Sequence, residues 1–207
     1  MNEHVVSVTP ESPHLATYTM KTPEVDYDHP AVRLKISELR EVCAGLEDYA
    51  KKAYEFVRDH IAHSWDIQSA RITCAASEAL LAGEGICYAK SNLLCALLRG
   101  NGIPAGFCYQ RLTLGDTPDT GYCIHALNGV YIDSAAKWIR LDARGNKPGV
   151  QAEFSLHQEK LAFPVRSELG EREYSTVYAE PNSRTIAVLK QHTNSIDMYL
   201  HGLPDEL

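Results

Sequence analysis

The stretch at residues 83–91, Gly-Glu-Gly-Ile-Cys-Tyr-Ala-Lys-Ser, most constrains what this chain can fold into. Two glycines free the backbone and deliver Cys87 to the first turn of a helix. The residues that follow, 93–98, are apolar on most of the helix circumference, which predicts a helix buried in the middle of the domain. Cys87 would then lie at a desolvated helix N-terminus, where unpaired N–H groups favour a thiolate.

A cysteine beside apolar residues has a second interpretation, as an inert part of the core. Free cysteine is among the most buried residue types, so Cys87 alone favours the core interpretation. A cysteine nucleophile also needs a base that takes its proton and a third group that orients the base. The presence of such partners elsewhere in the chain therefore decides between the two.

Length and composition predict an ordinary globular protein. The 207 residues fit one domain with elaborations, and hydrophobic residues at 44% with charged residues at 23% are typical globular values. The formal charge of −7 and the scattered positions of the 20 Lys and Arg residues argue against a nucleic acid or an anionic membrane as partner. The N-terminal residues lack a signal-peptide pattern, and no stretch approaches 18 consecutive apolar residues, so we expect a cytoplasmic protein.

Neither the cysteines nor the histidines predict a metal site. No C-x₂-C pair occurs among the six cysteines, and in a reducing compartment a chain of this length needs no disulfide framework. His60 and His63 lack a third ligand at suitable spacing, so they are interpreted as solvated histidines at a helix end. We expect no metal and no organic cofactor.

The first part of the chain predicts an extended arm followed by helices. Residues 1–30 combine several valines with prolines, which indicates a short strand at Val5, Val6 and Val8 and an arm over the surface. Asp28 is the expected N-cap of a helix that starts near Pro30 and runs towards residue 45. Apolar spacing predicts a second helix over 46–61 and a short one over 73–81.

The part after the Cys87 helix predicts strands. Alternation indicates strands at 105–114, 122–132 and 138–143, with a loop at 115–121. Weaker patterns suggest edge strands at 154–165 and 173–178 and short helices at 184–191 and 196–200. We therefore expect an α+β catalytic core at 31–150, with helices packed on a small antiparallel sheet, and a C-terminal elaboration at 151–207 packed on that core.

Two of these strands provide a base and an orienting group for Cys87. His125 and Cys123 share one face of their strand, and Asp142 and Arg140 share one face of the next. A two-residue turn at 133–134 would put His125 directly opposite Asp142, and a four-residue loop at 133–136 would make them diagonal neighbours on the same face. Both registers predict a His–Asp pair.

A competing turn signal lies within the first of these strands. Asn128-Gly129 is a strong hairpin dipeptide, and a turn there would separate His125 from Asp142. The longer hairpin is preferred because residues 130–132 continue the strand pattern, which makes Gly129 a bulge.

These residues resemble the transglutaminase-like superfamily of papain-fold cysteine enzymes. The resemblance covers about residues 46–145. It rests on four blocks: Leu-x-Gly-x-Gly-x-Cys at 81–87, Leu-Leu-Arg-x₂-Gly-Ile-Pro-Ala at 97–105, His-Ala at 125–126, and Lys-Trp-Ile-x-Leu-Asp-Ala at 137–143. The resemblance implies a papain-like core with Cys87 as nucleophile, His125 as base and acid, and Asp142 as the residue that orients the imidazole.

The chain departs from the family pattern near the acceptor side of the cleft. Leu127 stands where many members carry an aromatic residue, and the loop at 133–136 is longer than a tight turn. For the oxyanion hole we expect the backbone N–H of Cys87, with Trp65 or Gln68 as a possible second donor. A core role is the preferred interpretation of Trp65, because a buried indole dominates packing.

The expected chemistry is acyl transfer from a peptide or amide substrate through a thioester on Cys87. Water is the expected acceptor, a peptidase or amidase outcome, because nothing in the sequence indicates a dedicated amine site. Transglutaminase-type amine transfer is the alternative outcome. A non-catalytic binding module and a thiol redox sensor are alternatives of other classes; the complete Cys, His and Asp set argues against the first, and the lack of a Cys-x-x-Cys pair argues against the second. The sequence does not predict the oligomeric state.

Overall fold

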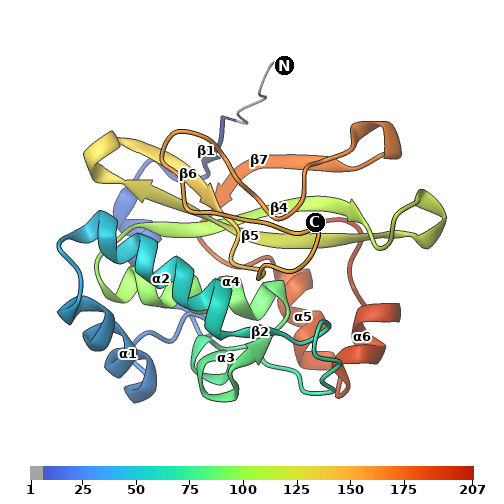
Figure 1. The fold of residues 1–207 in the computed structure, drawn as a ribbon, viewed down its shortest axis with the longest axis horizontal. Helices are drawn as coiled ribbons and strands as arrows, with labels where there is room; N and C mark the ends of the chain where they lie inside the picture. Colours follow the sequence, from blue (N-terminus) through green and yellow to red (C-terminus); the bar gives the residue numbers. More distant parts are fainter. Residues whose placement is uncertain (1–6) are drawn as a thin grey trace.

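The computed structural model describes residues 7–207, so the strand predicted at Val5 and Val6 lies outside the described part. A five-stranded sheet in the order β1-β7-β4-β5-β6 covers a layer of helices (Figure 1). The sheet is antiparallel except for β1, which runs parallel to β7. Its strands are β1 (Thr9–Pro10), β4 (Ala105–Thr113), β5 (Tyr122–Ile132), β6 (Lys137–Leu141) and β7 (Arg172–Tyr178). The α+β class is therefore confirmed.

Six α-helices and one small strand pair complete the described part of the chain. The helices are α1 (Pro30–Glu41), α2 (Leu46–His60), α3 (Ala76–Ala82), α4 (Cys87–Gly100), α5 (Ser183–Gln191) and α6 (Ser195–His201). The short strands β2 (Ala62–His63) and β3 (Glu84–Gly85) pair in parallel just before α4. Within residues 7–207, no helix has both the length and the apolar composition needed to cross a bilayer.

The helix that starts at Cys87 is the centre of the molecule. All its residues from Tyr88 to Arg99 are buried, which confirms the helix predicted from the apolar run. Gly83 ends α3 with a φ of 68°, a left-handed conformation that glycine adopts without strain. Gly85 lies so close to the Thr73 and Ala89 side chains that a Cβ would meet their atoms at 2.9 and 3.0 Å. Gly83 thus turns the chain, and Gly85 lets the backbone pass close to the Thr73 and Ala89 side chains just before Cys87.

The register of β5 and β6 confirms the long hairpin. Asn128 pairs with Leu141 and Ile132 with Lys137, which leaves the four-residue connection at 133–136. The predicted bulge at Gly129 is wrong, because the pairing continues through it without a shift on both sides. Glycine is needed there for space: a Cβ would lie 2.7 Å from Cγ1 of Val177.

Gly106 faces the same crowded strand β7, and we expect its replacement by Ala to be costly. The new Cβ would lie 2.5 Å from the Tyr178 carbonyl oxygen, a backbone atom that cannot rotate away. Overpacking of this kind costs about 1–3 kcal/mol of the free energy of unfolding, measurable by urea titration. Gly45→Ala is the control, since a Cβ there meets nothing within 4 Å and only a small N-cap effect remains. Equal stabilities of the two variants would contradict this account.

The predicted N-cap at Asp28 is wrong. The N-cap of α1 is His29, whose Nδ1 accepts the Ala31 N–H, while Asp28 pairs with Lys21. The N-terminal arm is anchored by Tyr18, which is fully buried and donates its hydroxyl to the Val177 carbonyl.

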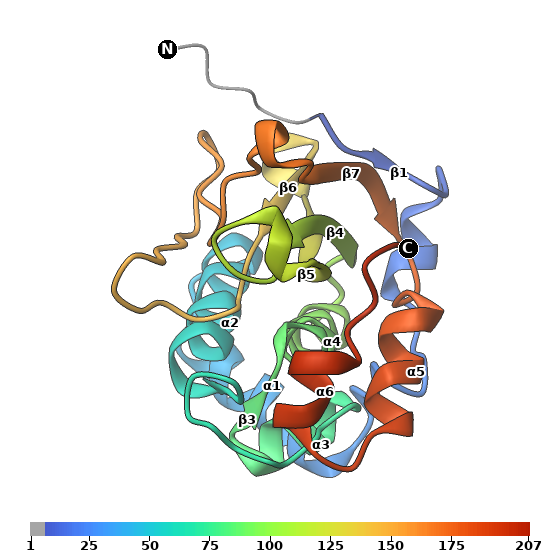
Figure 2. The same cartoon turned by 90° about the vertical axis from the view of Figure 1, so that its right-hand side faces the viewer.

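The C-terminal elaboration, residues 151–207, contributes to the sheet and to the helical layer. Helices α5 and α6 and strand β7 confirm the patterns at 184–191, 196–200 and 173–178, but β7 lies between β1 and β4 and is not an edge. The strand predicted at 154–165 is wrong. That segment contains Pro164, and its backbone groups bond side chains instead of a neighbouring strand. The Ala162 N–H donates to Asp142, and Gln110 donates to the Phe163 carbonyl. It belongs to a long irregular strap, residues 143–171, that leaves β6 and loops back to β7 (Figure 2).

Candidate active site

A buried His–Asp pair lies between β5 and the end of β6. His125 stands opposite Gln110 in the β4–β5 ladder, and its Nε2 lies 2.8 Å from Oδ2 of Asp142. The carboxylate has no exposed area and accepts two further hydrogen bonds, from the Arg144 N–H at 3.0 Å and the Ala162 N–H at 3.1 Å. Burial alone would raise the pKa of Asp142, but His125 and these N–H donors outweigh it and lower the pKa. The carboxylate is therefore held ionised.

Cys87 is the first residue of α4 and contacts the His125 imidazole. Because Nε2 of His125 bonds Asp142, Nδ1 is the nitrogen left to face the Cys87 sulfur. Burial alone would lower the pKa of His125, but the charges of Asp142 and Cys87 and their hydrogen bonds raise it to about 10. At neutral pH the imidazole is thus protonated, and its positive charge lies beside the Cys87 sulfur. The structure brings all three predicted residues together.

The sulfur and the imidazole open into a cavity of about 470 Å³. One wall is aromatic: the rings of Trp65 and Tyr199 stack with centroids 4.2 Å apart at 13°. Phe163 of the strap forms another wall, with its ring 5.3 Å from the His125 ring in an edge contact at 85°. Most of the cavity lining lies within the predicted catalytic core, but the later part of the strap, with Phe163, and α6, with Tyr199, lie outside it.

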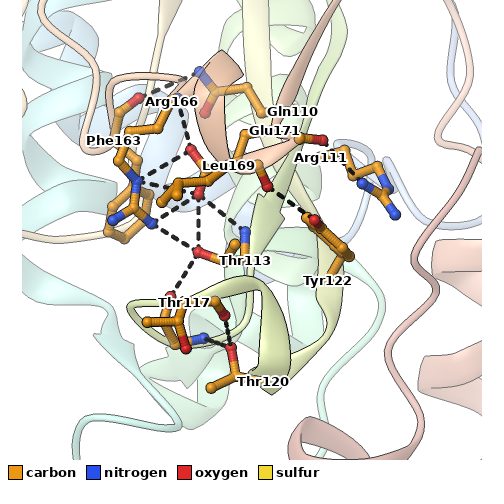
Figure 3. Close-up of polar contacts among 12 residues, drawn as sticks. Gln110, Arg111, Thr113, Thr117, Thr120, Tyr122, Phe163, Arg166, Leu169 and Glu171 are labelled. Atoms are coloured by element: carbon orange, nitrogen blue, oxygen red, sulfur yellow. Dashed lines mark hydrogen bonds and ion pairs between the residues drawn. The ribbon is translucent and has the colours of Figure 1, made fainter.

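The strap is fixed to β4 by a network of polar contacts around the buried Glu171 carboxylate, shown in Figure 3. Nη2 of Arg166 lies 2.7 Å from Oε1 of Glu171, and the same carboxylate accepts the N–H and the hydroxyl of Thr113 at 3.1 and 2.9 Å. Burial alone would raise the pKa of Glu171, but Arg166 and Thr113 lower it to about 2. These bonds hold Phe163, three residues before Arg166, against the imidazole.

Glu171→Gln is expected to make stability less dependent on pH in the acid range. The folded-state pKa of Glu171 lies below its unfolded value, so its contribution is present above about pH 4.5 and is lost as the pH falls towards 2. Thermal melts at pH 7, 4.5 and 3 measure this effect. The melting temperature of wild type should exceed that of the variant at pH 7, and the two melting temperatures should converge as the pH falls. Glu180→Gln, at an exposed position, is the control that should follow wild type at every pH. A constant gap between wild type and Glu171→Gln from pH 7 to 3 would contradict the assignment.

The two candidate oxyanion donors lie in different places. Trp65 lines the cavity beside Cys87. Gln68 is exposed and is not among the residues that line the cavity, and its amide donates to the Trp65 carbonyl at 2.6 Å. The structure thus brings Trp65 to the nucleophile and leaves Gln68 outside.

Two buried basic residues near Cys87 were missed or misread from the sequence. His63 is buried on β2 and lines the cavity, contrary to the prediction of a solvated helix end, and its Nδ1 has no hydrogen-bond partner. Burial and the charge of Arg144 lower the pKa of His63 well below its usual value, so its imidazole is neutral. Lys90, one turn after Cys87, is buried and donates to the Ile61 carbonyl; burial and Arg144 lower its pKa to about 7. No periodic pattern distinguishes either residue.

Two basic residues that line the cavity, Arg144 and Lys147, are paired with one carboxylate. Asp66 binds Arg144 at 2.8 Å and Lys147 at 2.7 Å, and these contacts lower the pKa of Asp66 to about 2 although burial opposes them. Within residues 7–207, no three His, Cys, Asp or Glu side chains are grouped so as to hold a metal ion.

A sequence model of the transglutaminase-like superfamily matches residues 37–143, more than half of the chain. The chain belongs to this superfamily. A search of curated proteins found no match. Among solved structures, the chain is similar to a candidate cysteine protease from Cytophaga hutchinsonii, with a TM-score of 0.51 and 17% identity over 67% of this chain and 46% of that one.

Two further structures are similar at lower scores. One is the periplasmic domain of TgpA from Pseudomonas aeruginosa, with a TM-score of 0.43 and 16% identity over 60% of this chain and 48% of that one. The other is a TGase, with a TM-score of 0.40 and 17% identity over 75% of this chain and 42% of that one. The chain thus spans less than half the length of these proteins. The similarity to the Cytophaga structure shows the fold, and superfamily membership supports cysteine-dependent acyl transfer in general.

Proposed function

We propose that this protein is a cysteine hydrolase that cleaves a peptide or amide substrate through a thioester on Cys87. The observation that carries the proposal is the position of His125, which contacts the Asp142 carboxylate on one side and the Cys87 sulfur on the other, at the wall of an open cavity. A structural His–Asp pair needs no cysteine at a helix N-terminus and no opening beside it. The description of the Cytophaga relative as a candidate cysteine protease agrees with this chemistry.

In the proposed first half-reaction, the Cys87 thiolate attacks the amide carbonyl carbon. The developing oxyanion accepts hydrogen bonds from the Cys87 N–H at the start of α4 and from the Trp65 indole. The His125 imidazolium then protonates the leaving amine, the C–N bond breaks and a thioester remains. Asp142 keeps the imidazole oriented with Nδ1 towards the sulfur.

In the second half-reaction, neutral His125 takes a proton from water, and the resulting hydroxide attacks the thioester carbonyl. The C–S bond breaks, the carboxylic acid leaves, and the thiolate and imidazolium are restored. Water is favoured over a lysine amine because water needs no binding site of its own. Amine transfer is the second candidate, because the aromatic walls formed by Trp65, Tyr199 and Phe163 restrict the access of water.

The decisive experiment combines detection of the thioester with a test of the acceptor. The protein is incubated with amide and peptide libraries, and intact-mass analysis looks for an acyl adduct that disappears in Cys87→Ala. With a substrate in hand, a labelled primary amine at about millimolar concentration competes with water for the thioester. Free acid as the main product supports a hydrolase. Predominant amide exchange would make the protein a transferase, and absence of any Cys87 adduct with all substrates that are turned over would reject the mechanism.

A simpler prediction concerns the reactivity of the six cysteines. Substoichiometric iodoacetamide near pH 6.5 should label Cys87 first, because only this thiol is paired with an imidazolium. Peptide mapping by mass spectrometry gives the order of labelling. Cys74 is the internal control, because burial raises its pKa to about 11. Faster labelling of Cys43 or Cys74 would contradict the active-site assignment.

A further inference from the structure

Cys123 is a second thiol in the cavity of Cys87, and the proposed hydrolysis does not use it. Both residues line the same cavity and both are half-buried. Cys123 precedes His125 by two positions on β5, so the two side chains share one face about 7 Å apart along the strand. His125 contacts the Cys87 sulfur, and the Tyr88 hydroxyl donates to the Ile124 carbonyl at 2.7 Å. The start of α4 is thus joined to β5 directly beside Cys123.

The other four cysteines do not share this position. All six are free thiols, but Cys95 and Cys108 are fully buried in the core, and Cys43 and Cys74 do not line the cavity. Cys108 packs with Tyr18 and Val177 in a separate cluster from the one that contains α4. Of the six cysteines, Cys87 and Cys123 are therefore the two that line the cavity.

The two thiols differ in their surroundings, which gives them different roles. Burial raises the pKa of Cys123 to about 12, and the negative charge of Cys87 adds to this effect. Cys123 is therefore a thiol at neutral pH, while Cys87 lies at a helix N-terminus beside the His125 imidazole, the surroundings in which a cysteine is activated. An oxidant that enters the cavity meets one reactive sulfur with a protonated thiol beside it.

We propose that Cys87 and Cys123 form a two-thiol oxidation site, which reduces one hydroperoxide and closes to a reversible disulfide. The sequence argued against a redox role because no Cys-x-x-Cys pair is present. The structure supplies the second thiol from a strand instead, 36 positions along the chain. This site needs only a reactive Cys87 and no amide substrate.

The first step is attack of the Cys87 thiolate on one oxygen of hydrogen peroxide. The O–O bond breaks, Cys87 becomes a sulfenic acid, and the leaving hydroxide takes the proton of the His125 imidazolium to give water. Cys87 has now lost the negative charge that helped to keep Cys123 protonated. In the second step, Cys123 loses its proton and its thiolate attacks the sulfenic sulfur. The S–O bond breaks, the S–S bond forms, and hydroxide leaves with that proton as a second water.

The test treats the full-length protein with one equivalent of hydrogen peroxide and maps its peptides without reduction. Trypsin alone leaves Cys74 and Cys87 in one peptide, so digestion after glutamate is added to cut at Glu84. The expected product joins the peptide of residues 85–90 to that of residues 112–137, with a mass two hydrogens below the sum. Dithiothreitol should separate them and restore iodoacetamide labelling of Cys87. This readout requires no variant and no known substrate.

Cys123→Ser tests the role of the second thiol. In this variant peroxide should convert Cys87 to sulfinic acid several-fold more than in wild type, and dithiothreitol should not restore labelling. Cys108→Ser is the matched control and should behave as wild type. If wild type and Cys123→Ser give equal sulfinic acid at Cys87 and no linked peptide forms, the proposal is overturned. A linked peptide without any thioester on amide substrates would reject the hydrolase and leave the oxidation site standing.

Discussion

Asp142→Asn is expected to lower turnover by roughly 10³–10⁴-fold while the fold is retained. The two carboxylate oxygens of Asp142 accept hydrogen bonds from His125 Nε2, from the Ala162 N–H and from the Arg144 N–H. An amide has only one accepting oxygen and no negative charge. If its NH₂ group faces the imidazole, Nε2 must become the acceptor and the proton moves to the nitrogen that faces Cys87. His125 is then unable to accept a proton from Cys87 or from a water molecule beside it.

The pH dependence of Cys87 alkylation separates this role from a structural one. Asp142 is the main group that raises the pKa of His125 against the effect of burial, so its loss should lower that pKa. The His125 imidazolium then loses its proton at a lower pH. The inflection assigned to it in the plot of Cys87 alkylation rate against pH should therefore move to lower pH. Circular dichroism checks the fold, and Asp116→Asn, a second carboxylate at the cavity, is the control. An Asp142→Asn protein with full turnover and an unshifted profile would remove Asp142 from the site.

Arg99→Ala is expected to cost about 3–5 kcal/mol of the free energy of unfolding, because it leaves buried carbonyl groups without donors. The Arg99 side chain is buried, and its guanidinium donates to three backbone carbonyls from three parts of the chain. The acceptors are Ala105 at 2.9 Å, Met20 at 2.6 Å and Ala179. These bonds tie the end of α4 to the N-terminal arm, to β4 and to the segment after β7.

Urea unfolding at neutral pH measures this loss. Arg99→Lys should recover only part of the stability, because an ammonium group cannot reproduce the planar fork of donors. Arg33→Ala, at an exposed position on α1, is the control and should change the free energy of unfolding by less than about 0.5 kcal/mol. Similar stabilities of the Arg99→Ala and Arg33→Ala proteins would show that the three carbonyls find other partners.

The sequence predicted the site best where the chemistry follows local periodicity. Alternation in two strands was enough to bring His125 and Asp142 to one face, and the structure selected the longer of the two registers considered. Glycines and an apolar run were enough to place Cys87 at the start of a buried helix. In each case the deciding interaction lies within one element or between neighbours in one hairpin.

Contacts between distant segments were not predictable in this way. Arg99 is a basic residue in the last turn of a helix, a pattern that predicts only a favourable interaction with the helix dipole. Its acceptors are separated from it by up to 80 positions, and no local pattern encodes them. Phe163 lies in an irregular strap, where backbone groups bond side chains and neither the period of a helix nor that of a strand applies.

The composition of the cavity wall has a consequence for the order of folding. Helices α2, α3 and α4 are close in the chain and can form and associate rapidly, whereas Phe163 and Tyr199 reach Cys87 only when very long loops close. Contacts between segments so far apart in the chain form more slowly than local helical contacts. During refolding, burial of α4 should therefore precede the appearance of a thiol with native reactivity. A stopped-flow experiment that follows helix content and Cys87 alkylation in parallel should find two separate rates, the second set by the docking of the strap and α6.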